Sequence, residues 1–129
     1  MTVERHGSGV EYESLVGYSR VVRAGSHVWV AGCTAVTEDG VVAGPGDAYV
    51  QAQQALTNVE AALAMVGARM EDVVRTRMYV TDISQWEAVG RAHGEAFRDI
   101  RPDTSMFEVS ALIDPRMLVE IEADAYIGG

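Results

Sequence analysis

The sequence contains no lysine and no second cysteine, and each absence excludes a class of chemistry. All ten basic residues are arginines, which excludes Schiff-base catalysis by lysine and phosphate binding by a P-loop. Cys33 has no second cysteine with which to form an internal disulfide, so nothing requires an oxidising compartment. The spacing of His6, His27 and His93 does not fit a metal site, so we expect no metal.

Long apolar runs and basic clusters are also absent. The formal net charge is −9, so neither nucleic acid nor an anionic membrane surface is an expected partner. The first fourteen residues carry no apolar core of the signal-peptide type. The glycine-rich stretches at 7–9 and 44–46 lack the third glycine of a dinucleotide-binding loop. These features predict a cytoplasmic protein that does not span a membrane.

The length and the periodicity of the chain predict one α+β domain over residues 1–129, with residues 1–14 as a loosely held arm. Two strands are expected within 18–36, and further strands at 73–81, 105–112 and 118–127. Asp47 should cap a helix over 47–67, and Ser84 with Glu87 should form the capping box of a second helix that ends near residue 98. The order is ββαβαββ, a two-layer fold in which two helices cover one face of a mixed sheet.

The other face of the predicted sheet has no covering element. We place the more apolar residues of each strand against the helices. The predicted core set is Val28, Val30, Gly32, Val74, Thr76, Met78, Val80, Phe107, Val109 and Ala111. The predicted uncovered set is His27, Trp29, Ala31, Cys33, Arg75, Arg77, Tyr79, Thr104, Met106, Glu108 and Ser110. Such a mixture of aromatic and charged side chains is typical of an oligomer interface with polar pockets.

The stretch LVEIEADAYI alternates strictly and places Glu120, Glu122 and Asp124 on the uncovered face. Arg75 and Arg77 are the natural counter-charges. Either all three acids belong to an ion-pair network, or one carboxylate stays free to meet a ligand. Glu120 is the candidate for chemistry, because a carboxylate in a semi-apolar pocket has a raised pKa suited to a general base.

Three stretches together resemble the RidA/YjgF family, which carries the older name endoribonuclease L-PSP. They are GYSRVVRAGSHVWVAG at 17–32, the segment from Ala55 to Phe97, and LVEIEADA at 118–125. The resemblance implies a chorismate-mutase-like fold and a homotrimer with small-molecule pockets at subunit interfaces. For the deaminase branch it also implies hydrolysis of small enamines and imines without a metal or organic cofactor.

The resemblance also suggests site residues. Tyr18 and Gly32 match the pocket tyrosine and glycine of the family, and Glu120 matches the glutamate that positions the attacking water. Four further positions match pocket positions but carry other residues than the family pattern: Ala31, Gly90, Thr104 and Met106.

Thr104 stands where the deaminase motif has its substrate-binding arginine. An arginine holds a carboxylate with two parallel hydrogen bonds, so its loss removes the main contact with an amino-acid-derived imine. Either Arg20, Arg75 or Arg77 replaces it, or the ligand is not a carboxylate. We therefore expect a divergent branch of the family.

Three functions remain open from the sequence. The first is hydrolysis of a small reactive enamine or imine, and the second is binding of a metabolite without catalysis. The third, ribonuclease activity, is disfavoured by the negative charge and by the absence of lysine and paired histidines. We expect Cys33 to be an inert small residue and His93 to be a hydrogen-bonded core or interface residue. A ferredoxin-like dimer is the structural alternative outside the family.

Overall fold

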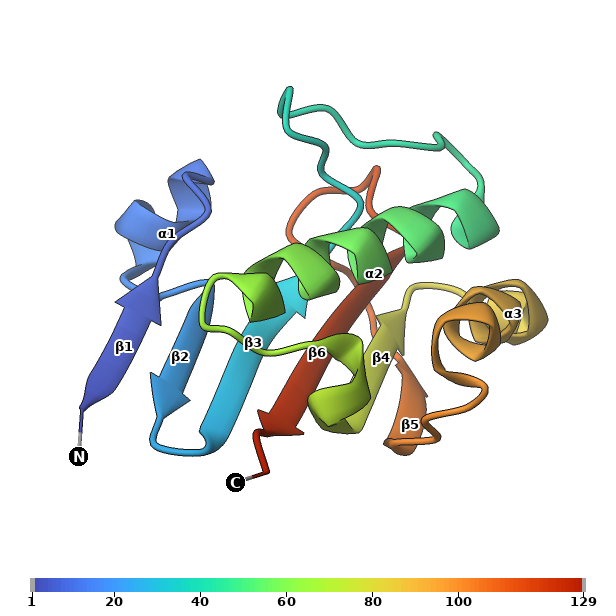
Figure 1. Ribbon diagram of the computed structural model, residues 1–129. Coiled ribbons are helices and arrows are strands. Elements are labelled where there is room, and N and C mark those ends of the chain that lie inside the picture. Colours follow the sequence, from blue (N-terminus) through green and yellow to red (C-terminus); the bar gives the residue numbers. More distant parts are fainter. Residues whose placement is uncertain (1, 129) are drawn as a thin grey trace.

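A six-stranded mixed sheet organises the computed structural model, which describes residues 2–128 (Figure 1). The strand order is β1-β2-β3-β6-β4-β5, and only the β4–β5 pair is parallel. The strands are β1 (Val3–His6), β2 (Val21–Ala24), β3 (His27–Cys33), β4 (Val73–Val80), β5 (Asp103–Glu108) and β6 (Val119–Tyr126). The helices are α1 (Glu11–Val16), α2 (Ala48–Ala64) and α3 (Trp86–Phe97), with short 3₁₀ turns at Met70–Asp72 and Ile83–Gln85.

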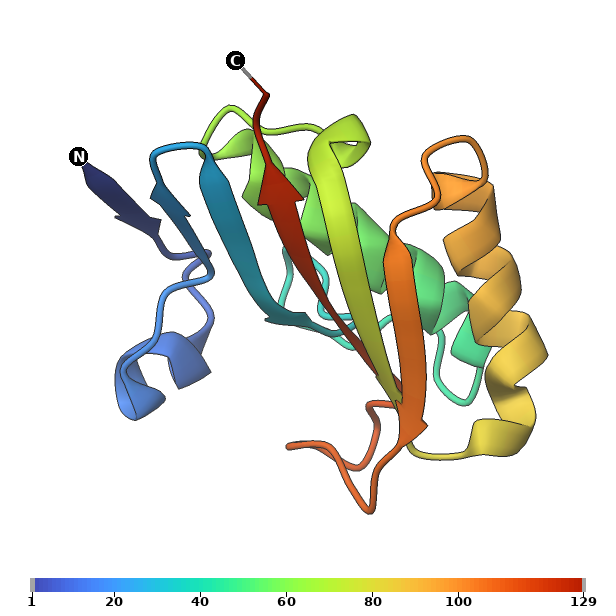
Figure 2. The same cartoon turned by 90° about the horizontal axis from the view of Figure 1, so that it is seen from below.

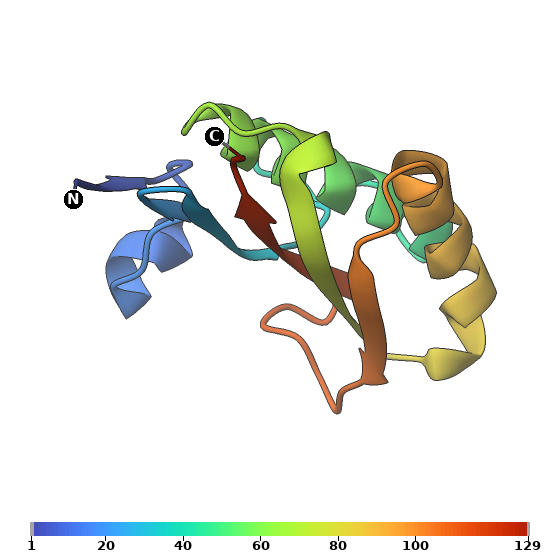
Figure 3. The same ribbon diagram turned by 60° about the horizontal axis from the view of Figure 1, so that its bottom comes forward.

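Helices α2 and α3 lie on the same face of the sheet, as the two views from below make clear (Figures 2 and 3). Asp47 caps α2 as predicted, since its side chain accepts a hydrogen bond from the backbone N–H of Val50. The opposite face, here called the open face, carries neither of these helices. The predicted two-layer α+β fold is therefore confirmed, and the strands from β2 onward follow the predicted order.

Strand β6 has the predicted orientation throughout. Its alternate residues Val119, Ile121, Ala123 and Ala125 are buried against the helix layer. The three acids between them therefore project onto the open face, which is the placement that matters for the site.

Two irregularities in register change the predicted facing of other strands. The pairing of β4 with β6 shifts between Val73 and Arg75, and Val74 is consequently 52% exposed instead of packed in the core. The pairing of β3 with β6 shifts between Val30 and Cys33, which moves Cys33 into the core, away from the open face. An extra residue in a strand reverses the facing of whatever follows, so strict alternation fails at both places.

Strand β5 faces the opposite way from the prediction. The hydroxyl of Thr104 lies 2.8 Å from that of buried Thr76, and Met106 packs against the core. Phe107 instead lies over Tyr79 with ring centroids 6.1 Å apart and is 49% exposed. The prediction placed the larger apolar residue in the core, but β5 is an edge strand whose open-face side chains include that phenylalanine.

The N-terminal region is more ordered than the loose arm expected for residues 1–14. Strand β1 pairs along its whole length with β2, and α1 follows it and ends at Gly17, which adopts a left-handed conformation. Every residue of β1 is exposed, so the strand has no apolar pattern by which the sequence could have indicated it. The start of α3 also differs: Asp82 accepts hydrogen bonds from Ser84 before the 3₁₀ turn, in place of the predicted Ser84–Glu87 box.

Within residues 2–128, no helix has the length and apolar character needed to cross a membrane.

Candidate functional site

The open face carries a row of three carboxylates along β6, each with a defined neighbour on β4 or β3. Glu120 lies opposite Tyr79, and Glu122 lies opposite Arg77. Asp124 lies between Arg75 of β4 and Trp29 of β3. All three acids are half-buried even though neither α2 nor α3 covers this face.

Two acids of the row are neutralised. The hydroxyl of Tyr79 donates a 2.7 Å hydrogen bond to Glu122, and this bond raises the pKa of the tyrosine. The guanidinium of Arg77 lies 3.4 Å from Glu122 and 3.6 Å from Asp124. The predicted ion-pair network therefore exists for these two residues, and it makes that part of the row structural.

Glu120 is the exception. Within residues 2–128 its carboxylate accepts no hydrogen bond and forms no ion pair. Burial raises its pKa above the ordinary value, the charge of Arg20 opposes that rise, and Glu122 adds to it. A desolvated carboxylate without a partner holds a proton more readily than an exposed one, which suits a general base.

Gly32 makes room for this carboxylate. A Cβ atom built on Gly32 would lie 2.6 Å from Cδ of Glu120, closer than real side chains approach. Gly32 sits within the register shift of β3, so the irregularity that buries Cys33 also brings the glycine backbone against Glu120. The structure thus brings Gly32 and Glu120 into direct contact.

Arg20 lies on the other side of Gly32. It is only 8% exposed. One terminal nitrogen donates to the carbonyl oxygens of Ala31 (2.9 Å) and Gly32 (2.6 Å) and lies 3.5 Å from Sγ of Cys33. The other terminal nitrogen donates to the hydroxyl of Tyr18 at 3.2 Å. Arg20 therefore binds the backbone of the irregular segment of β3.

Glu13 on α1 holds Arg20 in turn. Its carboxylate lies 3.4 Å from Nε of Arg20 and accepts hydrogen bonds from the backbone N–H and the hydroxyl of Ser8. These bonds to Ser8, with the charge of Arg20, lower the pKa of Glu13 although burial acts in the opposite direction. The sequence analysis missed Glu13 and Ser8, because both lie in the stretch expected to be loose. A carboxylate in an otherwise weakly patterned arm gives no signal that it will be buried.

The predicted site residues separate into two groups. Tyr18, Ala31, Gly32 and Glu120 lie near one another, with Arg20 at their centre. Gly90, Thr104 and Met106 lie on the helix side of the sheet within this chain. They belong to α3 or to the side of β5 that faces it.

Thr104 belongs to a hydrogen-bonded chain that also contains Thr76 and His93. Nε2 of His93 lies 2.8 Å from Oγ1 of Thr76, which lies 2.8 Å from Oγ1 of Thr104. Burial lowers the pKa of His93. This arrangement matches the predicted hydrogen-bonded histidine, and it occupies the hydroxyl of Thr104.

Each of the three arginines considered as a replacement cation has partners within its own subunit. Arg20 binds backbone carbonyls and Glu13, Arg75 binds Asp103 at 2.9 Å, and Arg77 lies between Glu122 and Asp124. A ligand carboxylate would have to compete with these contacts.

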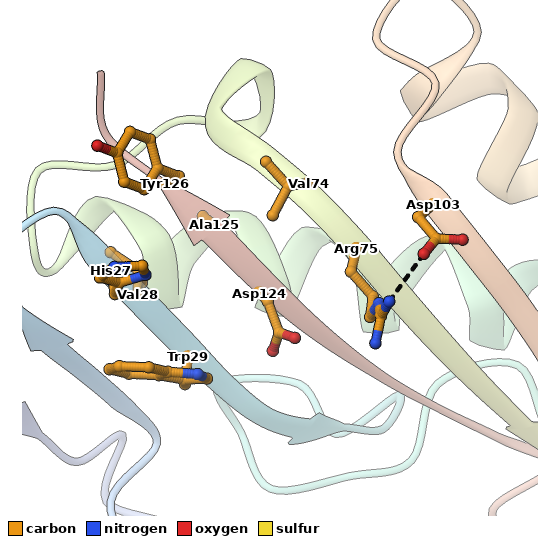
Figure 4. A pocket seen from close by; sticks show the side chains of 9 residues that line it. All are labelled: His27, Val28, Trp29, Val74, Arg75, Asp103, Asp124, Ala125 and Tyr126. Atoms are coloured by element: carbon orange, nitrogen blue, oxygen red, sulfur yellow. Dashed lines mark hydrogen bonds and ion pairs between the residues drawn. The ribbon is translucent and has the colours of Figure 1, made fainter. Parts of the chain in front are cut away.

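A shallow hollow of about 330 Å³ occupies the end of the open face away from Glu120 (Figure 4). Its aromatic side consists of His27, Trp29 and Tyr126, with His27 stacked on Trp29 at 5.8 Å. Asp124 and the Arg75–Asp103 pair complete it. Trp29 is 46% exposed, so the hollow adds exposed apolar area to the face that α2 and α3 leave uncovered.

No group of three or more His, Cys, Asp and Glu side chains among residues 2–128 is arranged to hold a metal ion.

Comparison with known proteins places this geometry among relatives. A family model described as Endoribonuclease L-PSP matches residues 9–127. An uncharacterized protein of Streptomyces coelicolor is 41% identical over 126 residues, which cover 98% of this chain and 93% of that protein. The RutC family protein UK114 of Drosophila melanogaster is 32% identical over 111 residues, or 86% of this chain and 80% of the relative.

A solved structure from Mycobacterium tuberculosis is also similar to this chain, both in sequence and in fold. It is described as a member of the highly conserved YjgF/YER057c/UK114 family and is 53% identical in sequence to this chain. The two structures superpose with a TM-score of 0.90, covering 98% of this chain and 100% of the other.

Proposed function

The chain belongs to the RidA/YjgF family, whose family model is described as Endoribonuclease L-PSP. From that premise we propose that it hydrolyses a small reactive enamine or imine, with Glu120 as the general base. Membership supports a function directed at small molecules. The observation that carries the finer proposal is the carboxylate of Glu120, which is half-buried and has no partner within residues 2–128, beside two acids that pair with Arg77.

Hydrolysis needs one proton acceptor and little else. The Glu120 carboxylate takes a proton from a water molecule as the water oxygen attacks the carbon of the C=N bond. The same group returns that proton to nitrogen, which gives a carbinolamine. It then takes the proton of the new hydroxyl group and delivers it to nitrogen, so that the carbon–nitrogen bond breaks and a carbonyl compound and ammonia leave. An enamine first becomes an imine by taking up a proton at carbon and losing the one on nitrogen. No electron is gained or lost, so the reaction needs neither an oxidant nor an organic cofactor.

The proposal includes a homotrimer in the cytoplasm, with the site completed at subunit interfaces. Glu120 lies on the open face, which in one subunit has no cover. That face also exposes Trp29, Val74 and Phe107 to an extent of about half of each residue's surface. Exposed apolar area of this kind is typical of an interface, and a second subunit would exclude water from Glu120.

The contacts of the arginines indicate whether the substrate carries a carboxylate. Because Arg20, Arg75 and Arg77 all have partners within residues 2–128, a substrate carboxylate would have to displace those partners to bind any of these three arginines. We therefore favour imines that carry no carboxylate, or one placed far from the reacting carbon.

Competition for imines tests this function. An amino-acid oxidase supplies imines that carry a carboxylate, and an amine oxidase supplies imines that do not, while semicarbazide traps whatever persists. We expect the protein to lower the trapped product from the second source more than from the first. Loss of neither product, with the oligomer verified by its mass in solution, would contradict the proposal.

A non-catalytic binding module is the second candidate, and the replacement of the family arginine by Thr104 favours it. A ligand that binds only the folded protein must raise its unfolding temperature. If a metabolite stabilises the protein but no imine is consumed, this second function is supported. Ribonuclease activity, which the older family name suggests, remains disfavoured by the net charge of −9.

A further inference from the structure

We propose that Arg20 is the positioning residue of this site: it fixes the irregular segment of β3 against Glu120 and supplies a positive charge that acts on that carboxylate. The proposal deepens the proposed function and rests on it for the role of Glu120. Arg20 acts through its contacts with other protein groups. Its contacts are with the protein backbone, Tyr18, Glu13 and Cys33.

Arg20 binds two neighbouring backbone carbonyls of β3. The carbonyls of Ala31 and Gly32 both accept hydrogen bonds from the same nitrogen of Arg20. The regular pairing of β3 with β6 breaks between Val30 and Cys33, so the strand ladder does not hold these two carbonyls in place. A guanidinium can bind two carbonyls at once because its donors are fixed in one plane. Arg20 therefore determines where the backbone of Gly32 lies relative to Glu120.

The side chain of Arg20 is itself held in place by the N-terminal segment and by Tyr18. Glu13 contacts Nε from α1, and Ser8 donates two hydrogen bonds to Glu13 from the loop after β1. The ring of Tyr18 also lies below the guanidinium, 5.5 Å from its carbon to the ring centroid. A chain of contacts thus leads from the N-terminal segment through Glu13 and Arg20 to Gly32.

Arg20 also contributes to the electrostatic surroundings of Glu120. The titratable groups that face Glu120 are Arg20 beside β2, Cys33 on β3, Tyr79 on β4 and Glu122 on β6. Burial raises the pKa of the Cys33 thiol, and the bond to Glu122 raises the pKa of Tyr79, so both are neutral near pH 7. Glu122 repels a second negative charge. Arg20 is consequently the one cation of this set that favours the ionised form of Glu120.

The test follows the titration of Glu120 by ¹³C NMR of its carboxyl carbon, which does not depend on turnover. Replacing Arg20 with glutamine removes the charge, and the midpoint of Glu120 should move to higher pH. Replacing it with lysine keeps the charge but loses the planar fork, and the midpoint should move less. Arg23→Gln is the matched control. Arg23 also donates to backbone carbonyls, those of Gly25 and Val66, but it does not face Glu120.

An unchanged midpoint in folded Arg20→Gln would overturn the proposal, and so would an equal shift in Arg23→Gln. If Arg20→Gln does not fold, the unaltered protein still provides a test. Its Arg20 Nε resonance should show a titration step at the Glu120 midpoint, and Glu120→Gln should abolish that step. A flat resonance would contradict the proposal. A shifted Glu120 midpoint in a protein that hydrolyses no imine would refute the proposed function alone.

If hydrolysis is found, the pH profile provides a second readout. The acidic limb of kcat/KM should move to higher pH in Arg20→Gln, because the free enzyme must lose a more tightly held proton. A purely structural role for Arg20 would lower the rate without moving that limb.

Discussion

Glu120 and Glu122 are two residues apart on the same strand and project from the same face, yet their surroundings differ completely. Glu122 accepts a hydrogen bond from Tyr79 and lies beside Arg77, while Glu120 has neither kind of contact within residues 2–128. Identical side chains on one strand can therefore have separate roles. Glu122 joins neighbouring strands, and Glu120 is kept free beside a glycine.

The difference originates in the strands on either side. Strand β4 places Arg77 directly opposite Glu122, and the arginine also reaches Asp124. At Glu120 the neighbour on β4 is Tyr79, whose hydroxyl is directed to Glu122 instead. On the β3 side, Glu120 meets the backbone of Gly32. Arg20, whose positive charge acts on Glu120, binds backbone carbonyls and Glu13 instead of that carboxylate.

Exchanging each glutamate for glutamine in turn should give the largest contrast. We expect Glu120→Gln to lower imine hydrolysis by about 10²- to 10⁴-fold, the usual contribution of a general base. Glu122→Gln should retain most of the activity, because the amide still accepts a hydrogen bond from Tyr79. The measurement is kcat/KM for both variants at the same oligomeric state. Equal losses would mean that the two acids act together, contrary to this interpretation.

The space beside Glu120 can be filled without changing any charge. Gly32→Ala would force its Cβ against the carboxylate, and we expect a loss of about 100-fold in activity, the size associated with a displacement of about 1 Å. Gly94→Ala on α3 is the control, since nothing lies within 4 Å of its added Cβ. Activity in Gly32→Ala equal to that of the control would show that the close approach has no role.

Stability should respond to the two glutamates with opposite signs. Glu122→Gln should lower the free energy of unfolding by about 1 kcal/mol, because Arg77 loses part of its ionic contact. Glu120→Gln should raise it at neutral pH by roughly 0.5–2 kcal/mol, the range common for stabilising substitutions, because the amide removes a buried charge that has no partner within residues 2–128. Chemical denaturation at one fixed protein concentration measures both values. A stability loss in Glu120→Gln would indicate a partner for Glu120 in the assembled protein.

The smallest effect is the pH dependence of that stability difference. The folded protein holds the Glu120 proton to higher pH than the unfolded chain does, because burial raises the folded pKa above 4.5. In that window the folded state binds more protons, so stability falls as pH rises through the folded pKa. Glu120→Gln lacks this fall. The two proteins should differ little below pH 4.5 and increasingly above it.

The sequence predicted β6 and α2 well because both have unbroken periodicity. The alternation of Val119, Ile121 and Ala123 determines which residues face the helices, and Asp47 marks the start of α2. With β6 oriented correctly, the acids could be assigned to the open face. The candidate site is therefore partly readable from one strand, and the family resemblance directs attention to Glu120 and Gly32.

The predicted facing of residues in β3 and β4 was wrong where the pairing departs from regular geometry. The register shifts beside Val74 and before Cys33 reverse the facing of residues that alternation would assign, and no local feature indicates them. The role of Arg20 depends on the same kind of departure, since its carbonyl partners lie in the irregular segment of β3. Glu13 depends on tertiary contact with Arg20, which periodicity does not report.

The ¹³C NMR titration of Glu120 in the unaltered protein tests the central claim most directly. Selective labelling and the Glu120→Gln variant would assign its carboxyl resonance. We predict a midpoint above the ordinary glutamate value of 4.5, as expected for a desolvated carboxylate without a partner. A midpoint at or below 4.5 would contradict the account, since it would mean that a cation neutralises Glu120 as Arg77 neutralises Glu122.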